Sequence, residues 1–289
     1  MSASARASAA TIPFGARARA KMAEFGPACI GIDPHASLLA DWGLPDSIAG
    51  LERFAMTTVE AVAGHAAFLK PQSAFFERHG AAGVAVLEKT IQAARAAGSL
   101  VILDVKRGDI GSTAAAYADA YLDASAPLGA DAITVSPFLG FGSLSPFFDA
   151  ARRNGAGVFV LALTSNPEGR EVQHACNGDE TVAGAILRQL TTLNAGIEPM
   201  GSMGAVVGVT IGDPPQAGDA PTAWDLAING PLLVPGLGAQ GGTVADLRRL
   251  FAAVSDNVIP ATSRGVLASG PDVARLRDAT RAVNDALTA

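Results

Sequence analysis

The stretch LVILDVKRGDIGST, residues 100–113, is the most informative part of the sequence for both fold and function. It opens with four apolar residues, two of them β-branched, as is typical of a buried strand. Asp104, Lys106 and Asp109 follow, and the Ser-Thr pair after them is typical of a helix start. The stretch therefore predicts a strand–helix unit with charged side chains where the strand ends.

Similar apolar runs recur along the whole chain, and most are separated by stretches with helical periodicity. The runs are nearly continuous rather than alternating, which indicates strands buried on both faces of a parallel sheet. They cover residues 28–33, 66–70, 100–106, 132–136, 157–165, 204–210, 232–235 and 257–264. Helices are predicted over residues 47–64, 83–98, 113–124, 180–196, 243–254 and 272–287.

Eight strand–helix units in 289 residues favour a (β/α)8 TIM barrel of the α/β class. A doubly wound open sheet is the competing architecture. No linker divides the chain, so we expect a single catalytic domain over residues 13–289, with a helix at 14–25. Residues 165–180 are long and polar and are predicted to form a surface loop, with a lid as one interpretation.

The amino-terminal residues lack acids up to residue 23 and are rich in Ala, Ser and Arg. This composition is that of a transit peptide, or of a disordered tail before the first helix. We favour the tail, over residues 1–12, because no cleavage-like break precedes the first strand.

The bulk composition excludes several classes of protein. A net charge of −6 and a pI near 5.2 argue against a broad nucleic-acid surface. No apolar run is long enough to span a membrane. Two distant cysteines, Cys29 and Cys176, are in no metal-like spacing, which favours a reduced, cytoplasmic protein.

Polar residues follow or end the predicted strands, where TIM-barrel enzymes carry their active sites. Asp104 and Lys106 are two residues apart on a strand, so their side chains point to the same face. Lys70, at the end of another strand, can reach the same mouth. Neighbouring carboxylates would keep such lysines charged, as proton donors that stabilise developing negative charge. From its spacing alone, Asp109 is better explained as an acid at the start of the following helix.

The sequence resembles the orotidine 5′-phosphate decarboxylase family, most closely its longer bacterial branch. The resemblance rests on an Asp-x-Lys-x-x-Asp signature in DVKRGDIGST. It extends in order through GIDPH, FLKPQSAFFE, LTSNPEG and PGLGAQGG, which begin at residues 31, 68, 163 and 235. It implies decarboxylation of orotidine 5′-phosphate (OMP) to uridine 5′-monophosphate (UMP) in pyrimidine biosynthesis, without a metal or other cofactor.

The resemblance also implies roles for individual residues. Lys106 would protonate C6 of the pyrimidine, Asp104 would lie against the substrate carboxylate, and Lys70 would complete the charged array. Asp109, with Thr113 beside it, would enter the neighbouring site of a homodimer. The predicted substrate-binding residues are Asp33, Thr113, Ile110, Ser165, Pro235, Gly238, Gln240, Gly241 and Arg264.

The glycine-rich stretch PGLGAQGGT, residues 235–243, contains a G-x-G-x-x-G pattern. A phosphate site is our first interpretation, because the loops after the last two strands of a TIM barrel bind phosphate. Gln240 and Arg264 would add side-chain donors. A plain turn and a dinucleotide site are the alternatives, the latter weak because the pattern comes late in the chain.

Three rival functions remain open at this point. A related barrel with a similar signature could be a Mg²⁺-dependent sugar-phosphate lyase, although Lys106 between two acids argues against a cation there. The glycine pattern could serve a nicotinamide-dependent oxidoreductase. A catalytically inactive barrel could simply bind a nucleotide.

Overall fold

The computed structural model describes residues 11–211, 224–238 and 241–289. Eight strands form a closed barrel in the order β1-β10-β9-β8-β5-β4-β3-β2, and every neighbouring pair is parallel. The predicted (β/α)8 barrel is therefore confirmed, and the alternative prediction of a doubly wound open sheet is wrong. The barrel strands are β1 (Cys29–Ile32), β2 (Phe68–Pro71), β3 (Leu100–Arg107), β4 (Ala132–Val135), β5 (Gly157–Leu163), β8 (Met203–Val207), β9 (Leu232–Pro235) and β10 (Val258–Thr262).

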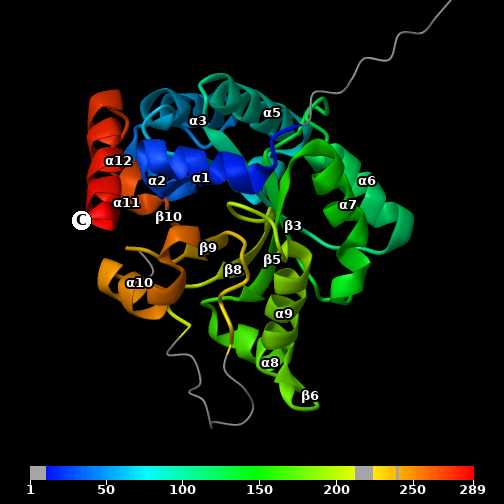
Figure 1. The fold of residues 1–289 in the computed structure, drawn as a ribbon. Coiled ribbons are helices and arrows are strands. Elements are labelled where there is room, and N and C mark those ends of the chain that lie inside the picture. The colour runs from blue at the N-terminus through cyan, green and yellow to red at the C-terminus, as the bar shows by residue number, and fades with distance from the viewer. Residues whose placement is uncertain (1–10, 212–223, 239–240) are drawn as a thin grey trace, which may run out of the picture.

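Helices surround the barrel on the outside (Figure 1). All six predicted outer helices are present, as is the helix predicted at residues 14–25. The α-helices are α1 (Phe14–Phe25), α2 (Ala36–Asp41), α3 (Ile48–Val62), α4 (Ala74–Glu77), α5 (Gly80–Ala96), α6 (Gly111–Leu122), α7 (Ser145–Asn154), α8 (Arg170–Gln173), α9 (Val182–Asn194), α10 (Val244–Leu250), α11 (Arg264–Leu267) and α12 (Val273–Thr288). Three 3₁₀ turns are η1 (Phe141–Leu144), η2 (Pro167–Gly169) and η3 (Ala252–Asn257).

The segment between β5 and α9, predicted as a plain surface loop, carries short elements of its own. It holds η2, α8 and a two-stranded antiparallel hairpin of β6 (Cys176–Asn177) and β7 (Glu180–Thr181). These elements are too short to leave a periodic pattern in the sequence.

The apolar core has two parts, one inside the barrel and one between the strands and the outer helices. The inner part contains Phe68, Ile102 and Phe159 from the strands, together with Phe14 and other residues of α1. Phe14 packs edge-to-face on Phe159 with ring centroids 5.9 Å apart. Helix α1 thus contributes to the interior of the barrel.

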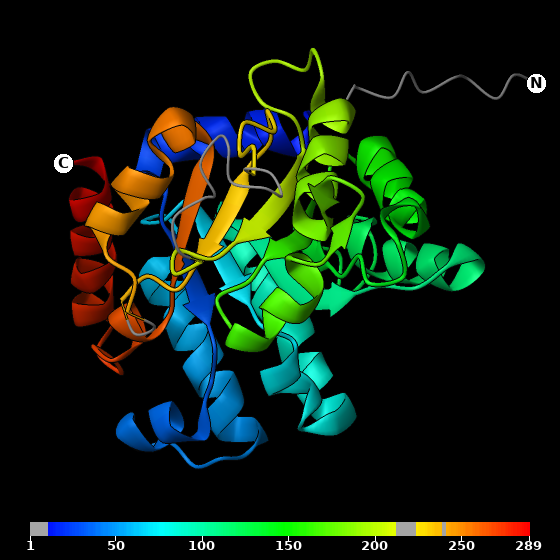
Figure 2. The same cartoon turned by 90° about the horizontal axis from the view of Figure 1, so that it is seen from below.

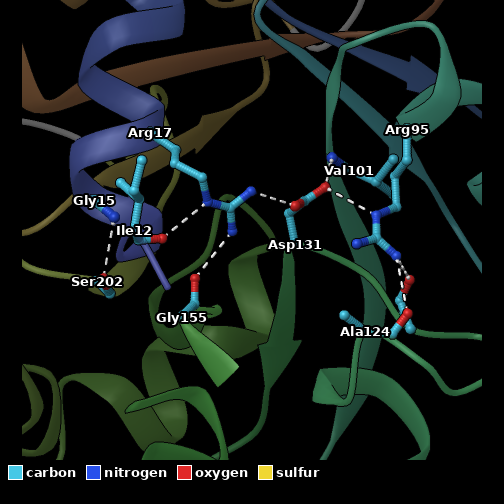
Figure 3. A network of polar contacts seen from close by, with 10 residues as sticks. Ile12, Gly15, Arg17, Arg95, Val101, Ala124, Asp131, Gly155 and Ser202 are labelled. Atoms are coloured by element: carbon cyan, nitrogen blue, oxygen red, sulfur yellow. Dashed lines mark hydrogen bonds and ion pairs between the residues drawn. The ribbon is translucent and has the colours of Figure 1, made fainter. Parts of the chain in front are cut away.

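Helix α1 closes the barrel at the end where the strands begin (Figures 1 and 2). Its Gly15 N–H donates to Ser202 Oγ at 3.0 Å, just before β8. Its Arg17 pairs with buried Asp131, just before β4, and donates to the Gly155 carbonyl before β5. Asp131 also accepts from the Val101 N–H at 2.9 Å (Figure 3). The opposite end, where the strands finish, is left for the site.

Within the described ranges no helix is both long enough and apolar enough to cross a membrane. Of the residues predicted to form a disordered tail, only Thr11 and Ile12 lie in those ranges, and neither is in a helix or strand.

Candidate active site

A cavity of about 460 Å³ opens at the carboxyl ends of the barrel strands. Seven predicted site residues line this cavity. They lie on six of the strands, or in the loops just after them: β1, β2, β3, β5, β9 and β10. The seven residues are Asp33, Lys70, Asp104, Lys106, Ser165, Pro235 and Arg264. The cavity is also lined by Gly31, His35, Gln72, Phe75, Thr134, Leu161, Thr164, Asn166, Val206, Leu233, Gly236, Leu237, Ala261, Thr262 and Ser263.

Lys70 and Asp104 form a buried ion pair at the base of this cavity. They come from neighbouring parallel strands, β2 and β3, and Lys70 Nζ lies 3.5 Å from Asp104 Oδ2. Burial opposes the charge on Lys70, but attraction to Asp33 and Asp104 outweighs it and raises the pKa of the amine. Burial likewise opposes the charge on Asp104, but Lys70 and Lys106 outweigh it and lower the pKa of the carboxyl. Both groups are therefore charged at neutral pH.

Lys106 reaches the same carboxylate from the rim. Its Nζ donates to Asp104 Oδ1 at 2.6 Å, and its side chain is 48% exposed. The backbone of Lys106 has φ +44°, in the left-handed region that non-glycine residues rarely adopt, and the pairing of β3 with β4 shifts register there. The ammonium group thus stands at the cavity mouth, held by an anion behind it.

Thr134, on β4, joins this cluster although nothing in the sequence singled it out. Its Oγ1 donates to Asp104 Oδ1 at 2.8 Å and accepts from the Lys106 N–H at 3.0 Å. A threonine within a strand is typical of ordinary sheet packing, so its residue type gives no functional signal.

Three buried oxygen atoms at the cavity have no hydrogen-bond partner within the described chain: Asp33 Oδ1, Ser165 Oγ and Ser263 Oγ. A Cβ added to Gly31 would lie 2.9 Å from Ser263 Cβ and 3.0 Å from Asp33 Oδ2, so glycine leaves these side chains room. Buried polar atoms without partners carry a free-energy cost that a ligand can relieve. Asp33 and Ser165 were predicted to bind substrate, whereas Ser263 was not.

The glycine-rich stretch does not line the cavity along its whole length. Pro235 does, but Gly238 and Gly241 do not. The Gly238 N–H donates to the Gly242 carbonyl oxygen at 2.9 Å, and the Gly241 N–H donates to the Gly238 carbonyl oxygen at 2.8 Å. Gln240 lies outside the described residues. Arg264, exposed at the start of α11, lines the cavity together with Gly236 and Leu237 of the glycine-rich stretch.

Asp109, Ile110 and Thr113 lie outside the cavity of their own chain. Asp109 Oδ1 accepts from the Ile110 N–H at 2.8 Å, just before α6. Ile110 is 62% exposed, and Thr113 is exposed too. These residues do not complete the site of their own chain.

Cys29 lies inside the barrel and is fully buried, as expected for a core residue. Burial raises the pKa of its thiol to about 12. Among the described residues, no group of three or more His, Cys, Asp or Glu side chains is arranged to hold a metal ion. The carboxylate oxygens of Asp104 instead accept hydrogen bonds from Lys70, Lys106 and Thr134.

Comparison with known proteins bears directly on this constellation. Residues 26–279 match the model of the orotidine 5′-phosphate decarboxylase / HUMPS family. The chain belongs to this family. The match runs from just before β1 into α12 and so includes every strand of the barrel.

Relatives of high identity in this family are named orotidine 5′-phosphate decarboxylase. The orotidine 5′-phosphate decarboxylase of Streptomyces coelicolor is 64% identical over 268 residues, covering 92% of this chain and 94% of the relative. That of Nocardioides sp. is 60% identical and covers 96% and 99%. A crystal structure from Streptomyces avermitilis, titled as the same enzyme, is 59% identical with a TM-score of 0.91 and covers 96% and 95%.

Proposed function

We propose that this chain decarboxylates OMP to UMP. The observation that carries the proposal is the Lys106 ammonium group held 2.6 Å from Asp104 Oδ1, beside the buried Lys70–Asp104 pair, at the mouth of a cavity large enough for a ligand. The names of the relatives at 60% identity and above support the same reaction.

The chemistry asks for a fixed positive charge. Loss of carbon dioxide breaks the bond from C6 to the carboxylate and leaves the electron pair on C6, where no carbonyl group can delocalise it. An ammonium group positioned beforehand stabilises that pair without reorganising at the moment of reaction. Lys106 then gives a proton from Nζ to C6 and is reprotonated by solvent, to which its side chain is open. No cofactor takes part in these steps.

The reaction requires the activation free energy to be lowered by on the order of 20 kcal/mol, which is more than any single contact supplies. Binding energy from the phosphate and ribose must therefore hold the ring against the charged cluster. Arg264 has the forked charge that suits phosphate, and Asp33 has an unpartnered oxygen for a ribose hydroxyl. Ser165 supplies a hydroxyl to the base, and Asp104 faces the substrate carboxylate. Gly238, Gln240 and Gly241 stay predictions as phosphate-loop residues.

We further propose that the active form is a homodimer that shares its sites. Ile110 is 62% exposed and Phe138 is 76% exposed, on the loops that follow adjacent strands β3 and β4. Exposed apolar side chains gathered in this way are typical of an interface. Beside the cavity lies a groove of about 880 Å³ that includes Phe138 and shares Lys106 and Thr164 with the cavity.

We propose that the loop before α6 of a second copy enters this groove. Ile110 would meet the exposed ring of Phe138, and Asp109 with Thr113 would approach Lys106 of the neighbouring chain. Asp109 would then add a second anion beside the ammonium group. We place the working enzyme in the cytoplasm, in agreement with its acidic charge and unpaired cysteines.

The deciding experiment follows the ultraviolet absorbance of OMP after addition of the purified protein, with and without EDTA. A fall in absorbance that EDTA leaves unchanged supports the proposal. Activity abolished by EDTA would favour the Mg²⁺-dependent lyase, which should then act on a sugar phosphate. Tight binding of a nicotinamide dinucleotide would favour the oxidoreductase, and UMP binding without turnover would favour the inactive barrel.

A further inference from the structure

Thr134 occupies the junction between the charged cluster and the distorted end of β3. It is 1% exposed and lies near the carboxyl end of β4. Its hydroxyl oxygen bonds to two parts of β3, the Asp104 carboxylate and the Lys106 main chain. One hydroxyl group thus connects the anion that holds Lys106 Nζ with the backbone from which Lys106 extends.

The direction of these two hydrogen bonds is fixed by chemistry. The Lys106 N–H can only donate, so Thr134 Oγ1 accepts there, at 3.0 Å. The hydroxyl proton is then free to donate to Asp104 Oδ1, which as a carboxylate oxygen can only accept, at 2.8 Å. Thr134 therefore satisfies both groups at once, and neither bond can reverse.

The Lys106 backbone needs such a restraint. A non-glycine residue at φ +44° is strained and persists only where its surroundings hold it. The neighbouring β3–β4 ladder shifts register between Leu103 and Arg107, so regular strand pairing does not hold Lys106. The bond to Thr134 takes the place of a ladder bond at this position.

We infer that Thr134 is a positioning residue for the proposed decarboxylation: it acts through Asp104 and Lys106 and fixes where the ammonium group points. The inference rests on the proposed function. Loss of the hydroxyl would leave the Lys106 N–H without its partner and would remove one of the two donors on Asp104 Oδ1. The lysine would then sample other positions, whereas the groups that face phosphate and ribose would stay in place.

The test compares Thr134→Val, which keeps the shape and loses the hydroxyl, with Thr134→Ser, which keeps the hydroxyl. We expect Thr134→Val to lower kcat by about 10- to 100-fold, as small misplacements of a reacting group do, with KM for OMP nearly unchanged. Thr134→Ser should retain most of kcat. Thr90→Val is the matched control, because Thr90 is equally buried and bonds only within α5, to the Val86 carbonyl.

A second measurement does not depend on turnover. The rate at which an amine-reactive reagent labels Lys106, located by mass spectrometry, reports how firmly its Nζ is held. Thr134→Val should label several-fold faster than wild type, and Thr134→Ser and Thr90→Val should not. This difference would stand even if wild type failed to convert OMP, an outcome that overturns the proposed function alone.

Three results would overturn the inference: an unchanged kcat and labelling rate in Thr134→Val, an equal loss in Thr134→Ser, or a loss expressed in KM alone. If Thr134→Val does not fold, Thr134→Ala replaces it in the comparison with Thr134→Ser, since alanine also lacks the hydroxyl and demands less space.

Discussion

Lys70 and Asp104 face each other from adjacent strands, with Nζ 3.5 Å from Oδ2 and only 9% of each side chain exposed. A charge so far from water is tolerated only with a partner, because the desolvation cost is several kcal/mol for each ion. The pair is therefore a structural unit as well as part of the site, and its two members should be studied together.

Asp104→Asn should destabilise the fold by about 3 kcal/mol or less, because it removes one of the two carboxylates, Asp104 and Asp33, that compensate the buried charge of Lys70. The double variant Lys70→Met/Asp104→Asn should recover part of that loss, since the uncompensated charge is removed. Urea unfolding of wild type, Asp104→Asn and the double variant at pH 7 measures both effects. If Asp104→Asn is as stable as wild type, the Lys70–Asp104 pair is well hydrated in solution and the prediction is wrong.

The pH dependence of stability should carry the signature of the same pair. Because folding lowers the pKa of Asp104, its carboxylate stabilises the folded state at pH values above the ordinary pKa of Asp, about 3.9. This stability is lost as the pH falls through the lower pKa of the folded state. The raised pKa of Lys70 adds stability that is present below its ordinary value of 10.5 and lost as pH rises through the folded value.

Wild type should thus lose stability relative to Lys70→Met/Asp104→Asn below roughly pH 4, and the difference between them should stay flat between roughly pH 5 and pH 9. Denaturant midpoints across this range provide the measurement. Parallel curves down to pH 2 would contradict the assigned shifts.

Lys106→Ala should lower kcat by more than about 1,000-fold, since even one lost electrostatic donor costs 10²–10³. Because buried Asp104 keeps Lys70 and Thr134 as partners, the fold should lose no more than about 1–3 kcal/mol. UMP should still bind through contacts to its phosphate. Calorimetric titration with UMP and absorbance assays with OMP separate the two effects. Lys89→Ala, at an exposed pair with Glu52, is the matched control. Near-normal turnover would remove Lys106 from its proposed role.

A mixture of two inactive variants should regain activity if the sites are shared. Consider a heterodimer of one Lys106→Ala subunit and one Asp109→Ala subunit. One of its two sites then contains both intact residues, and the other contains neither. Random exchange of equal amounts in a two-fold symmetric dimer should therefore restore about a quarter of the wild-type activity. Native mass spectrometry confirms that subunits exchanged. Exchange without recovery would place Asp109 in its own chain.

Arg17→Met should destabilise the fold by about 1–3 kcal/mol, because Asp131 loses a charged partner in buried surroundings. The kcat of the folded enzyme should not change, since α1 lies at the end of the barrel opposite the site. Lys21→Ala, at an exposed pair with Glu24, should cost less than about 0.5 kcal/mol. Urea unfolding alongside steady-state kinetics distinguishes the two. Equal effects from both variants would show that Arg17 does not anchor α1.

The barrel was predictable because parallel strands buried on both faces leave long apolar runs, and each of the eight runs became a barrel strand. The charged residues Asp33, Lys70, Asp104 and Lys106 were predictable for a related reason. Carboxyl ends of parallel strands converge, so polar residues there must meet.

Thr134 and Ser263 were not predictable, because their roles depend on what neighbouring strands place opposite them. A β-branched residue inside a strand is the expected choice for packing, and its hydroxyl bonds become visible only with β3 beside it. The register shift at Lys106 is equally hidden, since no glycine, proline or other break interrupts residues 100–106. Asp109 stayed ambiguous because its proposed partner belongs to another copy of the chain.

The contacts of α1 bear on how the protein is made. The Arg17 partner Asp131 lies 114 residues further along the chain, and the Gly15 partner Ser202 lies 187 residues further. A ribosome therefore releases this helix long before its polar partners Asp131 and Ser202 have been made. We expect it to join the rest late, after most of the polypeptide has emerged, and fusions or tags placed ahead of it should slow maturation more than they weaken the finished enzyme.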